Sequence, residues 1–169
     1  MRIYPWLKEK ELAKLNCLIP VHNPQDGGNY TELWFNTGEK YLAKNRVKTV
    51  IQYIASYLGV DIDQESAAWA AEARRHALPL VLAPNFTLVP VQVRRPPFRD
   101  AGGTGYVVRQ KIISWEKVEK GEFRTCLILA GDQKLFCLLK PASLLMRLAE
   151  ADKVTQLSQE IFNRLSGAT

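Results

Sequence analysis

The residues best suited to chemistry are three arginines in one short segment, Arg94, Arg95 and Arg99. Residues 94–105 also contain two prolines and three glycines, a composition typical of an exposed loop. A planar guanidinium group can bind phosphate through two parallel hydrogen bonds and can enter a narrow minor groove. The pattern therefore favours contact with a phosphate backbone over the simpler interpretation, a solvated loop.

Three further cations are weaker candidates for the same surface. The residues from Tyr106 to Lys117 alternate as in one long strand, which would place Arg109 and Lys111 on the same face. Lys134 belongs to the second strand of a predicted hairpin. We expect these three side chains to extend a basic surface beside the arginine loop.

The positive charge is concentrated in the middle of the chain. The formal net charge of the whole chain is +6. Residues 74–140 hold 12 Lys and Arg against 5 Asp and Glu, a net of +7, whereas the two flanks nearly cancel. A basic region of this kind suits a polyanion, because neutralised phosphates release counterions. A solvated basic face without a partner is the alternative.

Motifs for catalysis or metal binding are missing from the sequence. There is no Gly-x-Ser-x-Gly, no Cys-x-x-Cys and no histidine at metal-ligand spacing. The glycine-rich run 102–105 lacks the Lys-Ser/Thr of a phosphate-binding loop and leads into a strand, so we interpret it as a flexible turn. We predict a protein that is not an enzyme and needs neither metal nor cofactor.

The same predicted hairpin contains two cysteines, Cys126 and Cys137. Gly131-Asp132 between apolar runs predicts a two-residue type II′ turn, which would place Cys126 opposite Cys137. This pair is either a redox switch or, more simply, two small buried side chains in a reducing compartment.

Hydrophobic periodicity predicts one α+β domain over residues 1–169, mostly antiparallel sheet and hairpins, with a helix pair inserted in the middle and helices at both ends. Pro90 predicts an edge strand or a bulge. Asp152 is expected to cap a separate last helix, assigned to residues 154–169. Expected helices are 6–14, 47–58, 64–75 and one beginning at 141; expected strands are 17–22, 30–36, 40–44, 80–82, 86–93, 106–117, 123–130 and 133–140.

The N-terminal residues are charged throughout, and no stretch has the ~18 apolar residues of a membrane span. We therefore expect a cytoplasmic protein without a membrane partner.

From about Leu15 to Lys153 the order of predicted elements resembles the ComK family of bacterial competence transcription factors. The likeness is strongest in the second half of the chain. The similar segments are 15–60, the two short apolar strands around a Pro/Asn turn in 78–90, the Gly-aromatic strand entry 105–108, and the hairpin around 131–132 with the helix after it.

This resemblance implies a transcription factor that binds AT-rich double-stranded DNA with minor-groove contact, as a dimer or higher oligomer. The arginine loop would supply the DNA contacts. ComK-type proteins are also delivered to a protease by the adaptor MecA. This sequence differs from the family pattern in two ways. Residues 64–75 form an insertion relative to the family, and the longer basic tail of the family is missing here. Of the two family properties, we expect this chain to share DNA binding more readily than adaptor-controlled degradation.

Two other classes remain as alternatives. A protein-interaction module could retain the fold without DNA binding, using the predicted edge strand near Pro90 to pair with a partner. An enzyme of unrecognised type would need a deep pocket with convergent polar groups.

Overall fold

The computed structural model describes residues 4–62, 78–96 and 102–167. Its strands form two antiparallel sheets, one of six strands in the order β3-β2-β1-β6-β5-β4 and one of three in the order β7-β8-β9. The α+β class is as predicted. The predicted helix over 64–75 lies outside the described residues. The strands are β1 Leu15–His22, β2 Asn29–Phe35, β3 Lys40–Ala43, β4 Leu80–Ala83, β5 Phe86–Gln92, β6 Thr104–Val108, β7 Ile112–Lys120, β8 Phe123–Leu129 and β9 Gln133–Cys137; the helices are α1 Glu9–Leu12, α2 Val47–Tyr57 and α4 Pro141–Leu165, with short 3-10 turns η1 Arg109–Lys111 and η2 Ala130–Asp132.

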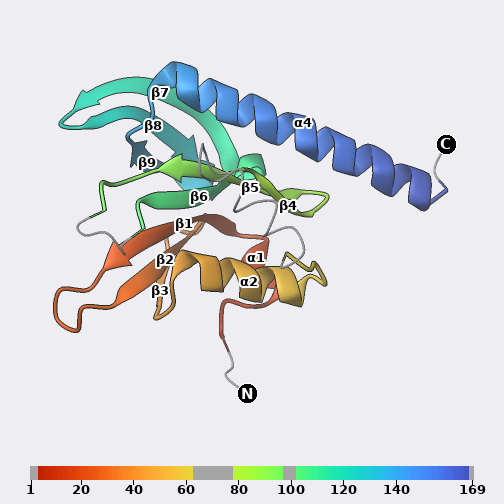
Figure 1. Cartoon of the computed structure of the whole chain (residues 1–169), viewed down its shortest axis with the longest axis horizontal. Helices are drawn as coiled ribbons and strands as arrows, with labels where there is room; N and C mark the ends of the chain where they lie inside the picture. The colour runs from red at the N-terminus through yellow and green to blue at the C-terminus, as the bar shows by residue number, and fades with distance from the viewer. Residues whose placement is uncertain (1–3, 63–77, 97–101, 168–169) are drawn as a thin grey trace.

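The six-stranded sheet is covered on both faces (Figure 1). On one face, Leu18 and Leu33 pack against Val50 and Ile54 of α2, and all four are fully buried. Burying such a side chain stabilises the fold by about 2 kcal/mol. The helical spacing predicted this apolar stripe, which is confirmed, and Gly59 with φ +78 follows α2 as predicted.

The other face of the sheet carries the three-stranded sheet and α4. Val89 and Val107 pack there with Leu127 of β8 and Leu144 of α4. Because side chains alternate along a strand, β1 contributes Leu18 to the first core and Cys17 to the second.

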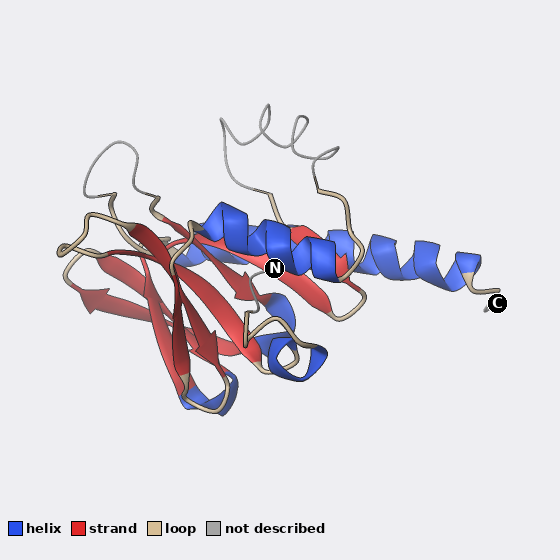
Figure 2. Cartoon of the chain, turned by 90° about the horizontal axis from the view of Figure 1, so that it is seen from below, coloured by secondary structure: helices blue, strands red, loops and turns tan. Residues whose placement is uncertain are grey.

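The C-terminal residues form one continuous helix, so the predicted break at Asp152 is wrong. Residues 142–165 contain neither glycine nor proline, the residues that most often end a helix. The Asp152 carboxylate instead bonds Arg109. The second half of α4 projects beyond the strands (Figure 2). Among the described residues, no helix is both long and apolar enough to cross a membrane.

The single strand predicted over Tyr106–Lys117 is also wrong. The chain leaves the six-stranded sheet at Val108, turns through η1 and enters the three-stranded sheet at Ile112. Two tertiary contacts accompany the turn. The side chain of Gln110 accepts a hydrogen bond from the Thr87 backbone N–H at 3.1 Å, and Arg109 pairs with Asp152.

The β8–β9 hairpin is confirmed, but its predicted turn and register are wrong. Gly131 and Asp132 both have positive φ, which a type II′ turn does not require, and three residues rather than two connect the strands. The side chain of Asn16 donates to the Ala130 carbonyl at 2.8 Å, outside the ladder.

The one-residue difference in register separates the two cysteines. Cys126 faces Phe136, and Cys137 faces Thr125. A shift of one residue puts side chains on opposite faces of a sheet, so the two thiols do not face each other.

Strand β5 is not an edge strand, contrary to one of the two predictions from Pro90. It lies between β6 and β4, although β4 pairs only as far as Leu88. Beyond that point the Pro90 carbonyl accepts from Arg147 at 3.4 Å, and the Gln92 carbonyl accepts from the Leu138 N–H. Proline is tolerated because its nitrogen faces this side, where β4 no longer pairs.

Candidate nucleic-acid interface

One of the predicted cations, Arg94, lines a hollow of about 190 Å³ together with two cations from the start of α2. We call this hollow the Arg94 pocket. Its cations, Arg46, Lys48 and Arg94, come from segments about fifty residues apart in the chain, and no carboxylate of the described residues lines it. The remaining lining residues are Pro20, Asn29, Tyr30, Val47, Gly102 and Thr104.

The Arg94 side chain is held by the base of the β5–β6 connection. Its Nε donates to the Gly102 carbonyl at 2.8 Å, and the Val93 N–H donates to the Gly103 carbonyl at 2.9 Å. Gly103 permits this approach, because a Cβ there would lie 2.5 Å from the Arg94 carbonyl oxygen. The sequence interpretation of the glycine run as only a flexible turn missed this requirement.

The Nη2 atom of Arg94 is buried and has no hydrogen-bond partner among the described residues. Burial lowers the pKa of this guanidinium from its usual value, but an arginine stays charged at neutral pH. A buried donor without a partner costs roughly 1–3 kcal/mol.

The start of α2 is unusual in its charges. Its N-cap residue is Arg46, which makes no side-chain cap, and the first turn has no acidic residue. Neither Arg46 nor Lys48 forms an ion pair with a described residue. The N-terminus of a helix favours negative charge, and a cation there is unfavourable by roughly 0.3–1 kcal/mol. An anion at this position would be stabilised by both the helix and the cations.

One carboxylate, Asp26, lies close to the pocket but is already hydrogen-bonded. The Tyr30 hydroxyl and the Gly28 N–H both donate to it. These bonds, the one from Tyr30 first, lower the pKa of Asp26 below its ordinary value. Asp26 is therefore charged at neutral pH, but it forms no ion pair with Arg46, Lys48 or Arg94 in the described structure.

Arg95 points away from the protein body and is largely exposed. Its Nε lies 3.1 Å from a carboxylate oxygen of Glu122, in the turn between β7 and β8. This ion pair places the β5–β6 connection beside the β7–β8 turn, and both lie at the left end of the molecule in Figure 1. Arg99 lies outside the described residues.

The remaining predicted cations, Arg109, Lys111 and Lys134, lie away from the Arg94 pocket. Arg109 follows the far end of β6, about 17 Å along that strand from the pocket residue Thr104. Both of its hydrogen bonds, at 2.8 and 3.1 Å, go to the two carboxylate oxygens of Asp152. Lys111 lies in the same 3-10 turn, and Lys134 lies on the edge strand β9. The structure does not bring these three residues to the Arg94 pocket.

Arg46 and Lys48 were missed because separation in sequence carries no information about this contact. A local signal was nevertheless present. The predicted helix 47–58 is preceded by Arg46 instead of a Ser, Thr, Asp or Asn cap, and its first turn has no Asp or Glu.

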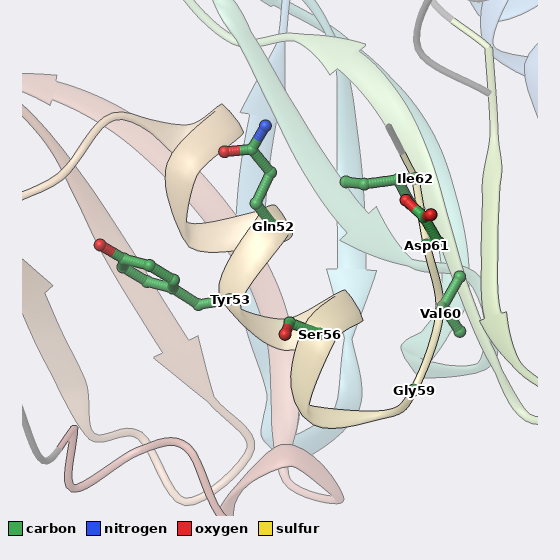
Figure 3. Close-up of a pocket in the computed structure, with 7 residues that line it drawn as sticks. All are labelled: Gln52, Tyr53, Ser56, Gly59, Val60, Asp61 and Ile62. Carbon is green, nitrogen blue, oxygen red and sulfur yellow. The ribbon is translucent and has the colours of Figure 1, made fainter. Parts of the chain in front are cut away.

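Another hollow, of about 460 Å³, lies at the opposite end of α2 (Figure 3). Its lining includes Gln52, Tyr53 and Ser56 from α2 and the carboxylate Asp61, but no lysine, arginine, histidine or cysteine among the described residues. The described lining therefore offers no cation for a phosphate and no thiol, and Asp61 is its one carboxylate, so it lacks the set of converging groups that most active sites combine.

The three cysteines are buried, free thiols. Burial is the main cause that raises the pKa of Cys17, Cys126 and Cys137 above the ordinary value, which keeps them protonated and weakly nucleophilic at neutral pH. The part of the chain that the structure describes holds no group of three His, Cys, Asp or Glu side chains able to bind a metal ion.

Comparison with known proteins finds no matching family model, no matching curated protein and no matching solved structure. The resemblance to ComK therefore stays a prediction.

Proposed function

We propose that this protein is a cytoplasmic bacterial transcription regulator that binds double-stranded DNA, with a backbone phosphate held in the Arg94 pocket. The observation that carries the proposal is the convergence of Arg46, Lys48 and Arg94 on one hollow, whose described lining contains no carboxylate. The basic middle of the chain and the resemblance to ComK support the same conclusion.

A phosphate group suits each of these side chains. Arg94 lines the pocket, and a planar guanidinium can bind phosphate oxygens in a bidentate way that the compact lysine ammonium cannot. Lys48 and the first N–H groups of α2 supply positive charge on the other side. Arg95, next to the pocket in sequence and largely exposed, is paired with Glu122, so we expect it to contribute less to DNA binding than Arg94.

The test is fluorescence anisotropy with AT-rich and GC-rich duplexes over a salt series. We expect AT-preferring binding that weakens steeply with salt. The variant R46Q/K48Q/R94Q should lower the salt slope by about 0.9, because the pocket holds one phosphate and each neutralised phosphate contributes about 0.9. The control K8Q/K10Q/K153Q removes the same charge from α1 and α4 and should retain most of the slope. An absence of binding by the wild type at low salt contradicts the proposal.

We also propose that the protein self-associates through the projecting half of α4. Four large apolar side chains there, Leu157, Ile161, Phe162 and Leu165, are between 46% and 83% exposed. The helical face that packs Leu144 and Leu148 on the sheet continues into Phe162 and Leu165 beyond it.

A second copy of the same helix fits this surface. At about 100 Å² exposed per side chain, two copies would bury roughly 800 Å² of apolar surface. This area lies below that of a stable interface, ~1,200 Å², and predicts a weak, concentration-dependent dimer. In sedimentation, F162E should abolish association, whereas M146E, at a more exposed site beside the sheets, should not. A strictly monomeric wild type contradicts the dimer.

The same helix favours the second candidate function, a protein-interaction module without DNA binding. The exposed apolar side chains of α4 supply a docking surface that the strand near Pro90 does not, because β5 is internal. Self-association or partner binding that depends on Phe162, together with no DNA binding at low salt, would favour this alternative.

A further inference from the structure

A second group of three cations surrounds another hollow, of about 260 Å³, at the start of α4. Lys117 comes from β7, Arg124 from β8, and Lys140 directly precedes α4. None of the three side chains forms an ion pair or a hydrogen bond with the described residues. We call this hollow the Lys140 pocket. Its remaining lining residues are Val118, Glu119 and Pro141.

The start of α4 repeats the unusual arrangement at the start of α2. The N-cap residues are cations in both helices, with nearly the same backbone angles: φ −66, ψ 155 for Arg46 and φ −65, ψ 153 for Lys140. Neither residue makes a side-chain cap, and neither first turn contains an acidic residue. In both places, cations from other elements join the positive end of the helix.

This arrangement is unfavourable without an anion and favourable with one. The positive end of the helix dipole repels Lys140, and the three cations repel one another. Glu119 reduces the formal charge of the lining only to +2. A bound phosphate would accept hydrogen bonds from Arg124 and from the lysines and would interact favourably with the helix N-terminus.

The two pockets lie at one end of the molecule. The ion pair between Arg95 and Glu122 joins the β5–β6 connection to the β7–β8 turn, which is flanked by Lys117 and Arg124. Figure 1 shows the start of α4, the β7–β8 turn and the β5–β6 connection at this same end.

We infer that the Lys140 pocket is a second phosphate-binding site, which takes another phosphodiester group of the nucleic acid held at the Arg94 pocket. This inference rests on the proposed function. It predicts that binding depends on two separate groups of cations, neither of which is the strand surface expected from Arg109 and Lys111.

The first experiment compares duplex binding by K117Q/R124Q/K140Q, wild type and the equal-charge control K8Q/K10Q/K153Q. We expect the pocket variant to lower the salt slope by about 0.9, the contribution of one neutralised phosphate, and the control to leave the slope close to that of the wild type. Thermal unfolding of both variants checks that they fold. A folded pocket variant that binds like the control overturns the inference and leaves the Arg94 proposal intact.

The second experiment separates the pocket from DNA binding. Titration of ¹⁵N-labelled protein with duplex DNA, and separately with inorganic phosphate, is followed at the Arg124 Nε–H resonance. A saturable shift in both titrations supports the site. A shift with inorganic phosphate in a protein that does not bind DNA retains the phosphate site but rejects the proposed function and the phosphodiester assignment. No shift in either titration overturns the inference.

Discussion

Arg94 and Arg109 have similar positions after their strands, but their side chains bind different acceptors. Each follows a strand of the same sheet, and each donates from Nε at 2.8 Å. The acceptor at Arg94 is the neutral Gly102 carbonyl, whereas the acceptors at Arg109 are the oxygens of Asp152. Within the described part of the chain, no carboxylate pairs with Arg94, whereas Asp152 neutralises the charge of Arg109. The difference teaches that charge in a sequence indicates a binding site only where the fold supplies no counter-charge.

The largest expected effect tests this comparison directly. R94A should weaken duplex binding by about 10- to 100-fold, because a hydrogen bond to a charged group contributes roughly 1.5–3 kcal/mol. R109A should change the affinity by less than about twofold, since its charge is already paired. Anisotropy at one fixed salt concentration measures both. Equal losses in the two variants would show that pairing with Asp152 does not remove Arg109 from the interface.

The next effect comes from the backbone that positions Arg94. G103A should lower both DNA affinity and stability by roughly 1–2 kcal/mol, because its Cβ would lie 2.5 Å from the Arg94 carbonyl oxygen. G102A is the matched control, since a Cβ at that position meets no atom within 4 Å. Anisotropy and thermal unfolding of both variants make the measurement. A G103A protein with wild-type affinity would mean that the Arg94 position is not set by this contact.

A smaller effect is expected at the ion pair between Arg109 and Asp152. A double-mutant cycle of R109A and D152A should give a coupling free energy of about 0.5–1 kcal/mol in unfolding experiments, because both side chains are partly exposed. The coupling should decrease in 1 M salt. A coupling near zero at low salt would indicate that the pair does not help to hold α4 on the sheet.

Local patterns predicted most elements because the same residues that set the pattern also form the core. One example is the apolar stripe of α2. Another is β2, where the neighbouring residues Leu33 and Trp34 alternate and pack in different cores. The predictions failed where distant residues decide the conformation. Gln110 bonds Thr87 in the turn after β6, and Asn16 bonds Ala130 at the three-residue turn.

The candidate site shows the same limit. The sequence identified Arg94 and Arg95 from their loop, but no periodicity connects them with Arg46, Lys48 or the cations around Lys140. Conversely, Arg109 and Lys111 seemed to share a face only because the strand was assumed to continue. Which cations gather is decided by strand order and by where the helices begin, and neither follows from local residue types.

The smallest effect concerns Asp26, the carboxylate nearest the Arg94 pocket. Its charge opposes a bound phosphate, so D26N should raise DNA affinity by about twofold, a Coulomb effect weakened by water. The hydrogen bond from Tyr30 lowers the pKa of Asp26, so the group stays ionised as the pH falls and gains a proton only below its ordinary range near 4.

The affinity difference between wild type and D26N should therefore be constant from pH 8 to pH 5. Y30F removes the main cause of the lowered pKa and should return the pKa of Asp26 toward its ordinary value, which an NMR titration of the carboxyl group measures. A D26N protein that binds more weakly than wild type would mean that holding Tyr30 in place matters more than the repulsion. The pocket would then depend on the β1–β2 loop as well as on its cations.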